Sequence, residues 1–193
     1  MDKLEKKSIT KSKILNYVIN NKTTSKTELA KELGLSMPTV LTNVNELMGK
    51  GVLVETGEYE STGGRKAKSL EINPPHRYAM GIVITANHVG MVLVNLKCDI
   101  EKIERTRLKF STDMSYCTKL SQMTKLFLKS MKNQDTLLGI GISIPGIINQ
   151  KENLLIKSHA LQVENFSLSF LEQAFPFPVY FENDANAAML AEN

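Results

Sequence analysis

The stretch TSKTELAKELGLSMPTVLTNVNELMGK, residues 24–50, constrains the fold most, because it places a helix signal on either side of a glycine. Ser25 and Glu28 have the S-x-x-E spacing of a capping box, which predicts that a helix begins here. Gly34 is the residue type that ends a helix in the left-handed backbone region, and Ser36 can cap the helix that follows. The sequence therefore predicts a short helix, a tight turn and a longer helix.

The longer helix is expected to bury one face and to leave a short polar face open. Pro38 suits its first turn, where no backbone N–H is needed. Apolar residues fall on one side of a helical wheel, namely Met37, Val40, Leu41, Val44, Leu47 and Met48. The opposite side carries Thr39, Thr42 and Glu46 and is flanked by Asn43. Small polar side chains of this kind can enter a major groove and bond base edges. The predicted DNA contacts are Ser36, Thr39, Thr42 and Asn43. A helix pair that serves only protein–protein contact is the alternative.

The flanking segments extend the helix pair into a larger module. Residues 8–20 place apolar side chains at roughly helical spacing, which predicts an amphipathic helix upstream. Downstream, Val52–Val54 forms an apolar strand, and Leu70 and Ile72 alternate with polar residues in a second strand. Two strands joined behind a helix-turn-helix predict a wing.

The loop between these strands, STGGRK, is rich in glycine and basic. Its two glycines let the backbone approach a surface closely, and Arg65, Lys66 and Lys68 supply positive charge. Such a tip suits contact with phosphates or insertion into a narrow minor groove. On this segment alone, a basic hairpin tip without a partner is the alternative.

Charge is distributed unevenly along the chain, whose net charge is +4. Residues 1–78 hold 13 Lys and Arg against 9 Asp and Glu, whereas residues 79–193 hold 11 of each. A basic head ahead of a neutral body is typical of a nucleic-acid-binding module joined to a sensing or assembly domain. A solvated basic surface would have the same composition.

The sequence also bears on location and bound metal. No run approaches the roughly 20 apolar residues of a membrane span, and no apolar segment follows the basic residues of positions 1–10, so we expect a cytoplasmic protein without a membrane partner. Cys98 and Cys117 lack CxxC spacing and a nearby histidine. We therefore expect reduced thiols, no disulfide, no zinc site and no cofactor.

Residues 79–193 alternate strand and helix patterns, as an α/β domain does. Strand-like apolar runs occur in YAMGIVIT, GMVLVNL and LLGIGISIP, with another candidate strand within residues 100–108. Helices are predicted over residues 115–131, from Leu168 onward, and after the strand PVYFE. This alternation favours parallel strand pairings, with ligands at the carboxyl ends of strands. We place the domain boundary at the Pro-Pro pair, which gives domains of residues 1–73 and 74–193.

Three stretches together carry a resemblance that covers nearly the whole chain. They are LAKELGLSMPTVLTNVNELMGKGVLVETGEYESTGGRKAKSLEINPPHRYAMGIVI, LLGIGISIPGIIN and VYFENDANAAMLAE. With them the sequence resembles the repressor branch of the ROK family of repressors and sugar kinases, which includes regulators that respond to xylose, N-acetylglucosamine and glucose. The resemblance implies a winged helix-turn-helix followed by the first lobe of an actin-like α/β sugar-kinase domain. The sequence stops before the family's second lobe, so apolar surface on the terminal helix is expected to be exposed.

The resemblance also implies a nucleotide-binding turn, D-x-G-G-T, from which this sequence departs. Val83 stands where the family's kinases have the Asp, and Thr85, Ala86 and Asn87 replace Gly-Gly-Thr. A valine offers no metal ligand, and side chains hinder the close backbone approach that a phosphate-binding loop requires. We expect no phosphoryl transfer at this loop and assign no catalytic or metal-binding residue.

Asn183 and Asp184 match, in the family, a sugar-contacting residue and the general base of the kinases. A carboxylate can act as such a base, but without a phosphate site we expect weak sugar binding at most. Ala160 and Val163 depart from the family's N-L-x-W sugar segment. Stabilisation of the terminal helix by its dipole is the alternative role for Asp184.

Three functions follow as hypotheses from these features. The first is a transcriptional regulator, a repressor of carbohydrate-metabolism genes, that binds a double-stranded DNA operator as a homodimer and has a small sugar as candidate effector. The second is a ROK-type sugar kinase with Asp184 as general base. The third is a body that serves only as an assembly platform.

Overall fold

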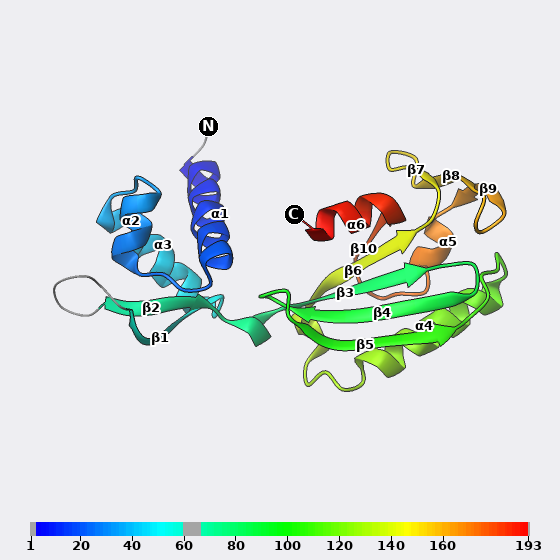
Figure 1. Ribbon diagram of the computed structural model, residues 1–193, viewed down its shortest axis with the longest axis horizontal. Coiled ribbons are helices and arrows are strands. Elements are labelled where there is room, and N and C mark those ends of the chain that lie inside the picture. The colour runs from blue at the N-terminus through cyan, green and yellow to red at the C-terminus, as the bar shows by residue number, and fades with distance from the viewer. Residues whose placement is uncertain (1–2, 60–66, 193) are drawn as a thin grey trace. The chain divides into compact units, whose positions relative to one another are not determined.

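The computed structural model describes residues 3–59 and 67–192, and the chain divides into two compact units, Met1–His76 and Arg77–Asn193 (Figure 1). The predicted boundary after residue 73 falls just before the 3-10 helix Pro74–His76, which ends the first unit. Within the described ranges, no helix is both long enough and apolar enough to cross a membrane.

The described part of the first unit contains three helices followed by an antiparallel pair of strands. They are α1 (Lys3–Asn21), α2 (Lys26–Glu32), α3 (Met37–Gly49), β1 (Leu53–Tyr59) and β2 (Ala67–Ile72). Thr24, just before α2, exchanges backbone hydrogen bonds of 2.7 and 3.1 Å with Leu70 of β2. The predicted helix-turn-helix and wing are confirmed, and α1 begins earlier than the predicted residue 8.

Apolar side chains from the three helices and both strands form the core of this unit. They are Ile14, Val18, Leu29, Val40, Val44, Leu47, Leu53, Leu70 and Ile72. Full burial of one such side chain stabilises the fold by roughly 1.5–3 kcal/mol relative to exposure. Contacts of α3 with α1 and β1 therefore fix which side of α3 faces outward.

The buried side of α3 is rotated about the helix axis relative to the predicted one. Its core residues at positions 40, 44 and 47 recur at helical spacing on one side. The buried arc extends from there toward Asn43, which is 5% exposed, whereas Leu41 is 39% and Met37 is 40% exposed. The apolar pattern predicted the correct side of the helix, and packing against α1 and β1 decided its rotation.

The second unit is built on a five-stranded mixed sheet with strand order β10-β6-β3-β4-β5. Its strands are β3 (Tyr78–Ile84), β4 (His88–Asn95), β5 (Ile100–Arg107), β6 (Leu137–Ile144) and β10 (Val179–Asn183). The predicted parallel pairing is confirmed between β3 and β6 and between β6 and β10. It is wrong for β4 and β5, which pair antiparallel, because connections of only a few residues reverse the chain direction.

Helices and a smaller sheet surround the five-stranded sheet. The helices are α4 (Met114–Leu128), α5 (Ser169–Glu172) and α6 (Asp184–Glu192). The smaller antiparallel sheet contains β7 (Ile147–Asn149), β8 (Leu154–Ser158) and β9 (Val163–Ser167), and it was not predicted from the sequence. Figure 1 shows α4 on one face of the large sheet and α6 on the other. The main core lies on the α4 side, where Ile82, Met91 and Ile142 of the sheet and Leu120 and Phe127 of α4 are buried.

Candidate nucleic-acid interface and candidate sugar site

The turn between α2 and α3 is fixed by local hydrogen bonds. The Ser25 hydroxyl accepts a hydrogen bond from the backbone N–H of Glu28 at 3.1 Å, which confirms the predicted N-terminal cap of α2. Gly34 has a φ of +62°, a conformation that costs glycine little. The backbone N–H of Leu35 then donates to the carbonyl of Ala30 at 2.9 Å. The two helices are therefore joined without a long loop.

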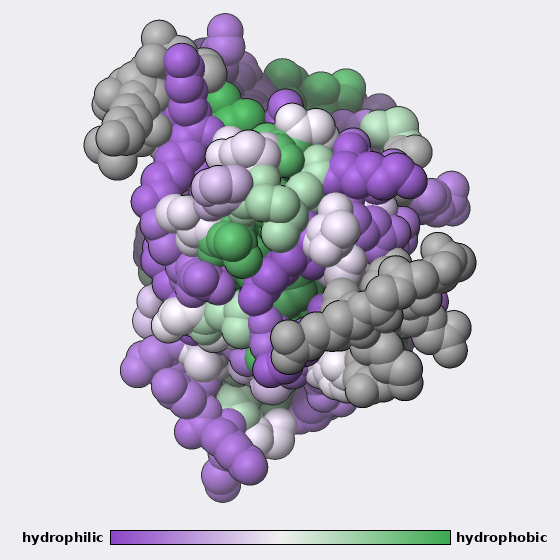
Figure 2. All heavy atoms as spheres, turned by 90° about the vertical axis from the view of Figure 1, so that its left-hand side faces the viewer, coloured by the Kyte–Doolittle hydropathy of each residue, from purple (hydrophilic) through white to green (hydrophobic). Residues whose placement is uncertain are grey.

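The open face of α3 presents hydroxyl groups. Ser36 and Thr42 are exposed and Thr39 is half-buried. The Ser36 and Thr39 hydroxyls lie 2.9 Å apart, and the Thr42 hydroxyl donates to the carbonyl of Pro38 at 2.9 Å. A hydroxyl that donates one hydrogen bond keeps its acceptor lone pairs, so these side chains can still accept from base amino groups. Figure 2 shows one side of the first unit, on which hydrophilic residues predominate around a small area of white and green residues.

Asn43 does not belong to this open face, contrary to the prediction. Its amide donates to the backbone carbonyl of Thr39 at 2.8 Å, and the amide oxygen is buried without a hydrogen-bond partner. The rotation of α3 described above turns Asn43 into the unit. Its buried side chain is therefore not presented for the predicted contact with DNA.

Glu46 links α3 to α1 through two lysines. Its carboxylate accepts hydrogen bonds from Lys7 and from Lys11, the latter with an N–O distance of 2.6 Å. Bonding to Lys11 and then to Lys7 lowers the pKa of Glu46 from 4.5 to about 2. The carboxylate is therefore ionised at neutral pH and holds both lysines beside α3.

Of the three basic residues predicted for the wing, the structure describes Lys68. Arg65 and Lys66 lie outside the described residues, whereas Lys68 is on β2 with its side chain 73% exposed. The Lys68 ammonium lies 3.0 Å from a carboxylate oxygen of Glu55 on β1. The same carboxylate binds Lys26, and no sequence pattern had indicated Lys26 or Glu55. Only the folded structure brings these residues together, because Lys26 and Glu55 are separated by 29 positions.

In the second unit, Asn183 acts as a cap for α6. Its side-chain oxygen accepts from the backbone N–H of Ala185 at 2.8 Å and of Asn186 at 3.3 Å, and its amide donates to the carbonyl of Gly146. Asp184 is exposed, and one of its carboxylate oxygens accepts from the backbone N–H of Ala185 at 3.0 Å. Both predicted sugar contacts thus serve the start of a helix, the structural role considered for Asp184.

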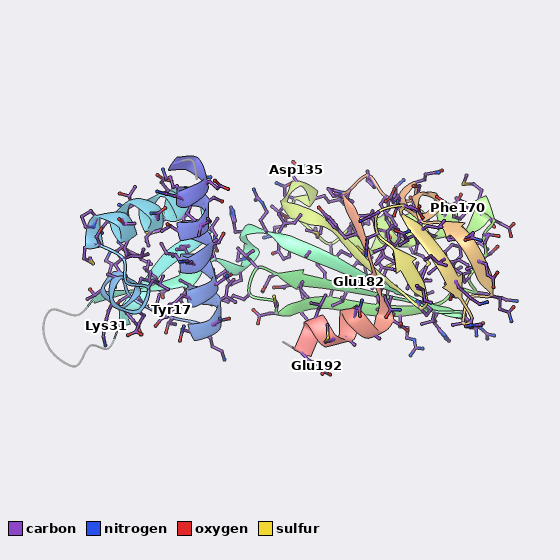
Figure 3. The ribbon with its side chains drawn as sticks, turned by 90° about the horizontal axis from the view of Figure 1, so that it is seen from above. Tyr17, Lys31, Asp135, Phe170, Glu182 and Glu192 are labelled. Carbon is purple, nitrogen blue, oxygen red and sulfur yellow. The ribbon has the colours of Figure 1, made fainter. Side chains whose placement is uncertain are left out.

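Glu182, at the end of β10, reinforces this helix start (Figure 3). Its carboxylate accepts from the side-chain amide of Asn186 at 3.0 Å and from the backbone N–H of Asn183 at 2.8 Å. These two hydrogen bonds lower the pKa of Glu182. The polar groups around the strand end are therefore bonded mainly to one another.

The turn at residues 85–87, which departs from the D-x-G-G-T pattern, closes a hairpin between β3 and β4. The Thr85 backbone N–H donates to the His88 carbonyl at 2.9 Å, and the Thr85 hydroxyl accepts from the His88 N–H at 3.0 Å. The carbonyls of Ala86 and Asn87 accept from the segment after β5. Val83 is 46% exposed beside this turn. Among the described residues, no group of three or more His, Cys, Asp or Glu is placed to hold a metal ion.

A cleft of about 760 Å³ lies between α6 and the second face of the large sheet. Tyr180, Gly141, Gly81, Val92 and Ile103 are paired in register across five strands and form one row of this face. Its centre is therefore flat and apolar. Neither predicted sugar contact is among the described residues that line the cleft. Met189 and Leu190 of α6 are exposed, as expected for this helix.

Comparison with known proteins divides the chain in the same way as its fold. Residues 7–54 match a family model described as winged helix-turn-helix DNA-binding, and residues 79–193 match the model described as ROK family. The xylose repressor of Caldicellulosiruptor bescii is 31% identical over 189 residues, which cover 96% of this chain and 47% of that protein. The xylose repressor of Bacillus subtilis is 26% identical over 96% of this chain and 49% of its own length.

A solved structure shows the same arrangement of elements. It is a ROK family transcriptional regulator, a homologue of the Escherichia coli MLC protein, with a TM-score of 0.65 and 22% identity. The match covers 88% of this chain and 43% of that chain. The chain thus spans about half the length of the curated relatives that it matches.

Proposed function

Because the chain belongs to the ROK family and carries a winged helix-turn-helix module, we propose that it is a DNA-binding transcriptional regulator of the repressor type. Its target is a double-stranded operator that controls genes of carbohydrate use, in keeping with relatives named xylose repressors. The observation that carries the proposal is the outward hydroxyl face of α3, which shares one compact unit with a wing that bears exposed Lys68.

The proposed contacts divide by chemistry. Ser36, Thr39 and Thr42 of α3 face the major groove, where hydroxyls bond base edges or phosphates. The wing contacts the phosphate backbone or the minor groove through Arg65, Lys66 and Lys68. The concentration of excess positive charge in residues 1–78 supports this assignment.

The regulator is proposed to work as a homodimer in the cytoplasm. One winged module offers few base contacts, and a two-fold operator doubles them. A small sugar is the proposed effector, with Asn183 and Asp184 as candidate contacts. Its binding is expected to be weak, because the Asn183 side chain already bonds Gly146, Ala185 and Asn186.

The second unit is proposed to be without kinase activity. Val83 supplies no metal ligand, the carbonyls of the neighbouring turn accept from the segment after β5, and its Thr85 hydroxyl is bonded to His88 within the hairpin. Consumption of ATP in the presence of a hexose or pentose, abolished by Asp184→Asn, would contradict this proposal.

The function is tested by fluorescence anisotropy of the full chain with a labelled 30-base-pair duplex. We expect affinity to fall steeply as salt rises from about 50 to 200 mM, because binding releases counterions from phosphates. Arg65→Ala should weaken binding by about three- to tenfold. It should also reduce the salt slope, the steepness with which the logarithm of the affinity falls with the logarithm of the salt concentration, by about one. The matched control is Arg105→Ala on exposed β5 of the second unit, which should leave the affinity unchanged. Binding that is absent or insensitive to salt would contradict the proposal.

A further inference from the structure

Glu55 on β1 binds two lysines that come from different elements of the first unit. The Lys26 ammonium, at the first residue of α2, donates to one carboxylate oxygen at 2.6 Å. The Lys68 ammonium on β2 lies 3.0 Å from the other carboxylate oxygen. Both oxygens of Glu55 are therefore occupied, and α2 is connected to the wing through this one side chain.

The cluster retains the capacity to bind an anion. Hydrogen bonds from Lys26 and then Lys68 lower the pKa of Glu55, so the carboxylate is ionised at neutral pH. Two ammonium groups and one carboxylate leave a net charge of one positive unit. Each ammonium has three N–H donors, and binding one carboxylate oxygen leaves donors available. The Lys26 side chain is 26% exposed and that of Lys68 is 73% exposed, so solvent reaches both.

We propose that Lys26 and Lys68 form a joint contact site for a DNA phosphate, and that Glu55 both positions the two lysines and limits their attraction for phosphate. This inference rests on the proposed function and adds to it a contact on α2 and a restraint on binding. When a phosphate approaches, the lysines turn donors toward its oxygens, while the carboxylate repels it. Because affinity for duplexes of any sequence depends on how many phosphates are neutralised, Glu55 lowers this general affinity. A lower general affinity raises the ratio of operator binding, which depends on base contacts from α3, to binding of duplexes of other sequence.

The test compares Glu55→Gln with the wild-type chain on a duplex of random sequence, by anisotropy over a range of salt concentrations. Removal of the carboxylate charge should tighten binding by about three- to tenfold at 50 mM salt and steepen the salt slope by about one. Lys26→Gln should have the opposite effect, with weaker binding and a shallower slope. Circular dichroism checks that each variant is folded, and Lys26→Gln decides the outcome if Glu55→Gln does not fold.

The matched control is Glu164→Gln in the second unit. Glu164 lies 2.6 Å from Lys157, so this substitution removes the same charge from a similar surface ion pair. It should leave the affinity and the slope unchanged.

The inference is overturned if Glu55→Gln binds no more tightly than Glu164→Gln, or if Lys26→Gln leaves the salt slope unchanged. A wild-type chain that binds no duplex would instead reject the proposed function. The two failures are therefore distinguishable in one set of measurements.

Discussion

Gly34 and Asn43 illustrate how single residues determine which surface of the helix pair remains open. Gly34 has a φ of +62°, and a Cβ placed there would have no neighbour within 4 Å, so its requirement for glycine comes from the backbone alone. Asn43 has one bonded amide and one buried oxygen without a partner. The left-handed conformation of Gly34 could be predicted from the sequence, since helices commonly end at a glycine in that conformation. The burial of Asn43 could not be predicted, because it depends on the rotation of α3.

Gly34→Ala should destabilise the first unit by about 1–2 kcal/mol, because an alanine is strained in the left-handed region. Urea unfolding followed by circular dichroism measures this change. Gly49→Ala is the matched control, since Gly49 lies in α3, has no positive φ and also has open space around its Cβ position. The control should be neutral or stabilising by up to about 1 kcal/mol. Equal effects of both substitutions would show that the conformation of Gly34 is not the cause.

At the scale of elements, α3 is held from two directions. Its apolar side packs on the core, and Glu46 binds Lys7 and Lys11 of α1. The helical periodicity places Glu46 on the open side of α3, but local patterns could not predict its pairing with residues 39 and 35 positions away. Helical periodicity reports which side is polar, whereas the identity of an ion-pair partner depends on how two helices cross.

This pairing predicts a pH dependence of stability. The pKa of Glu46 is lowered from 4.5 to about 2 in the folded chain, so its contribution is present above pH 4.5 and is lost as pH falls toward 2. The wild-type chain should therefore unfold at a higher urea concentration than Glu46→Gln at pH 7, and this difference should disappear near pH 2. The control is Glu32→Gln, which removes an exposed acid of α2 that lies 3.5 Å from Lys31 and should change the urea midpoint little at pH 7. A gap between wild type and Glu46→Gln that is constant with pH would contradict the ion-pair explanation.

At the scale of the whole molecule, the chain consists of two units, each with its own core. The first contains the proposed DNA contacts, and the second contains the proposed sugar contacts and a sheet whose second face is apolar at its centre. Since a unit with its own core can fold alone, the DNA-binding chemistry should be separable from the body.

A fragment of residues 1–76 should therefore fold cooperatively and bind a labelled duplex with a salt-dependent affinity. Its affinity should be lower than that of the full chain, because the second unit is the expected assembly domain and the proposed dimerisation is lost with it. Circular dichroism and anisotropy measure both properties. A fragment of residues 77–193 is the control and should fold without binding DNA. An unfolded first fragment, or strong binding by the second, would contradict this division.

The sequence by itself determined the features that depend on neighbouring residues. Capping residues, the glycine turn and apolar periodicity predicted the helix-turn-helix, and an apolar run and an alternating segment predicted the two wing strands. These patterns are local because hydrogen bonds within a turn or helix, and the faces of one element, are set by residues a few positions apart.

Only the tertiary structure decided the features that depend on distant packing. These include the burial of Asn43, the Glu55 and Glu46 ion pairs, and the capping role of Asn183. The small sheet of β7, β8 and β9 also belongs here, since its strands are short and left-handed residues such as Asn153 and Gln162 adjoin them. Their positions result from the packing of complete elements, which no local pattern of residues specifies.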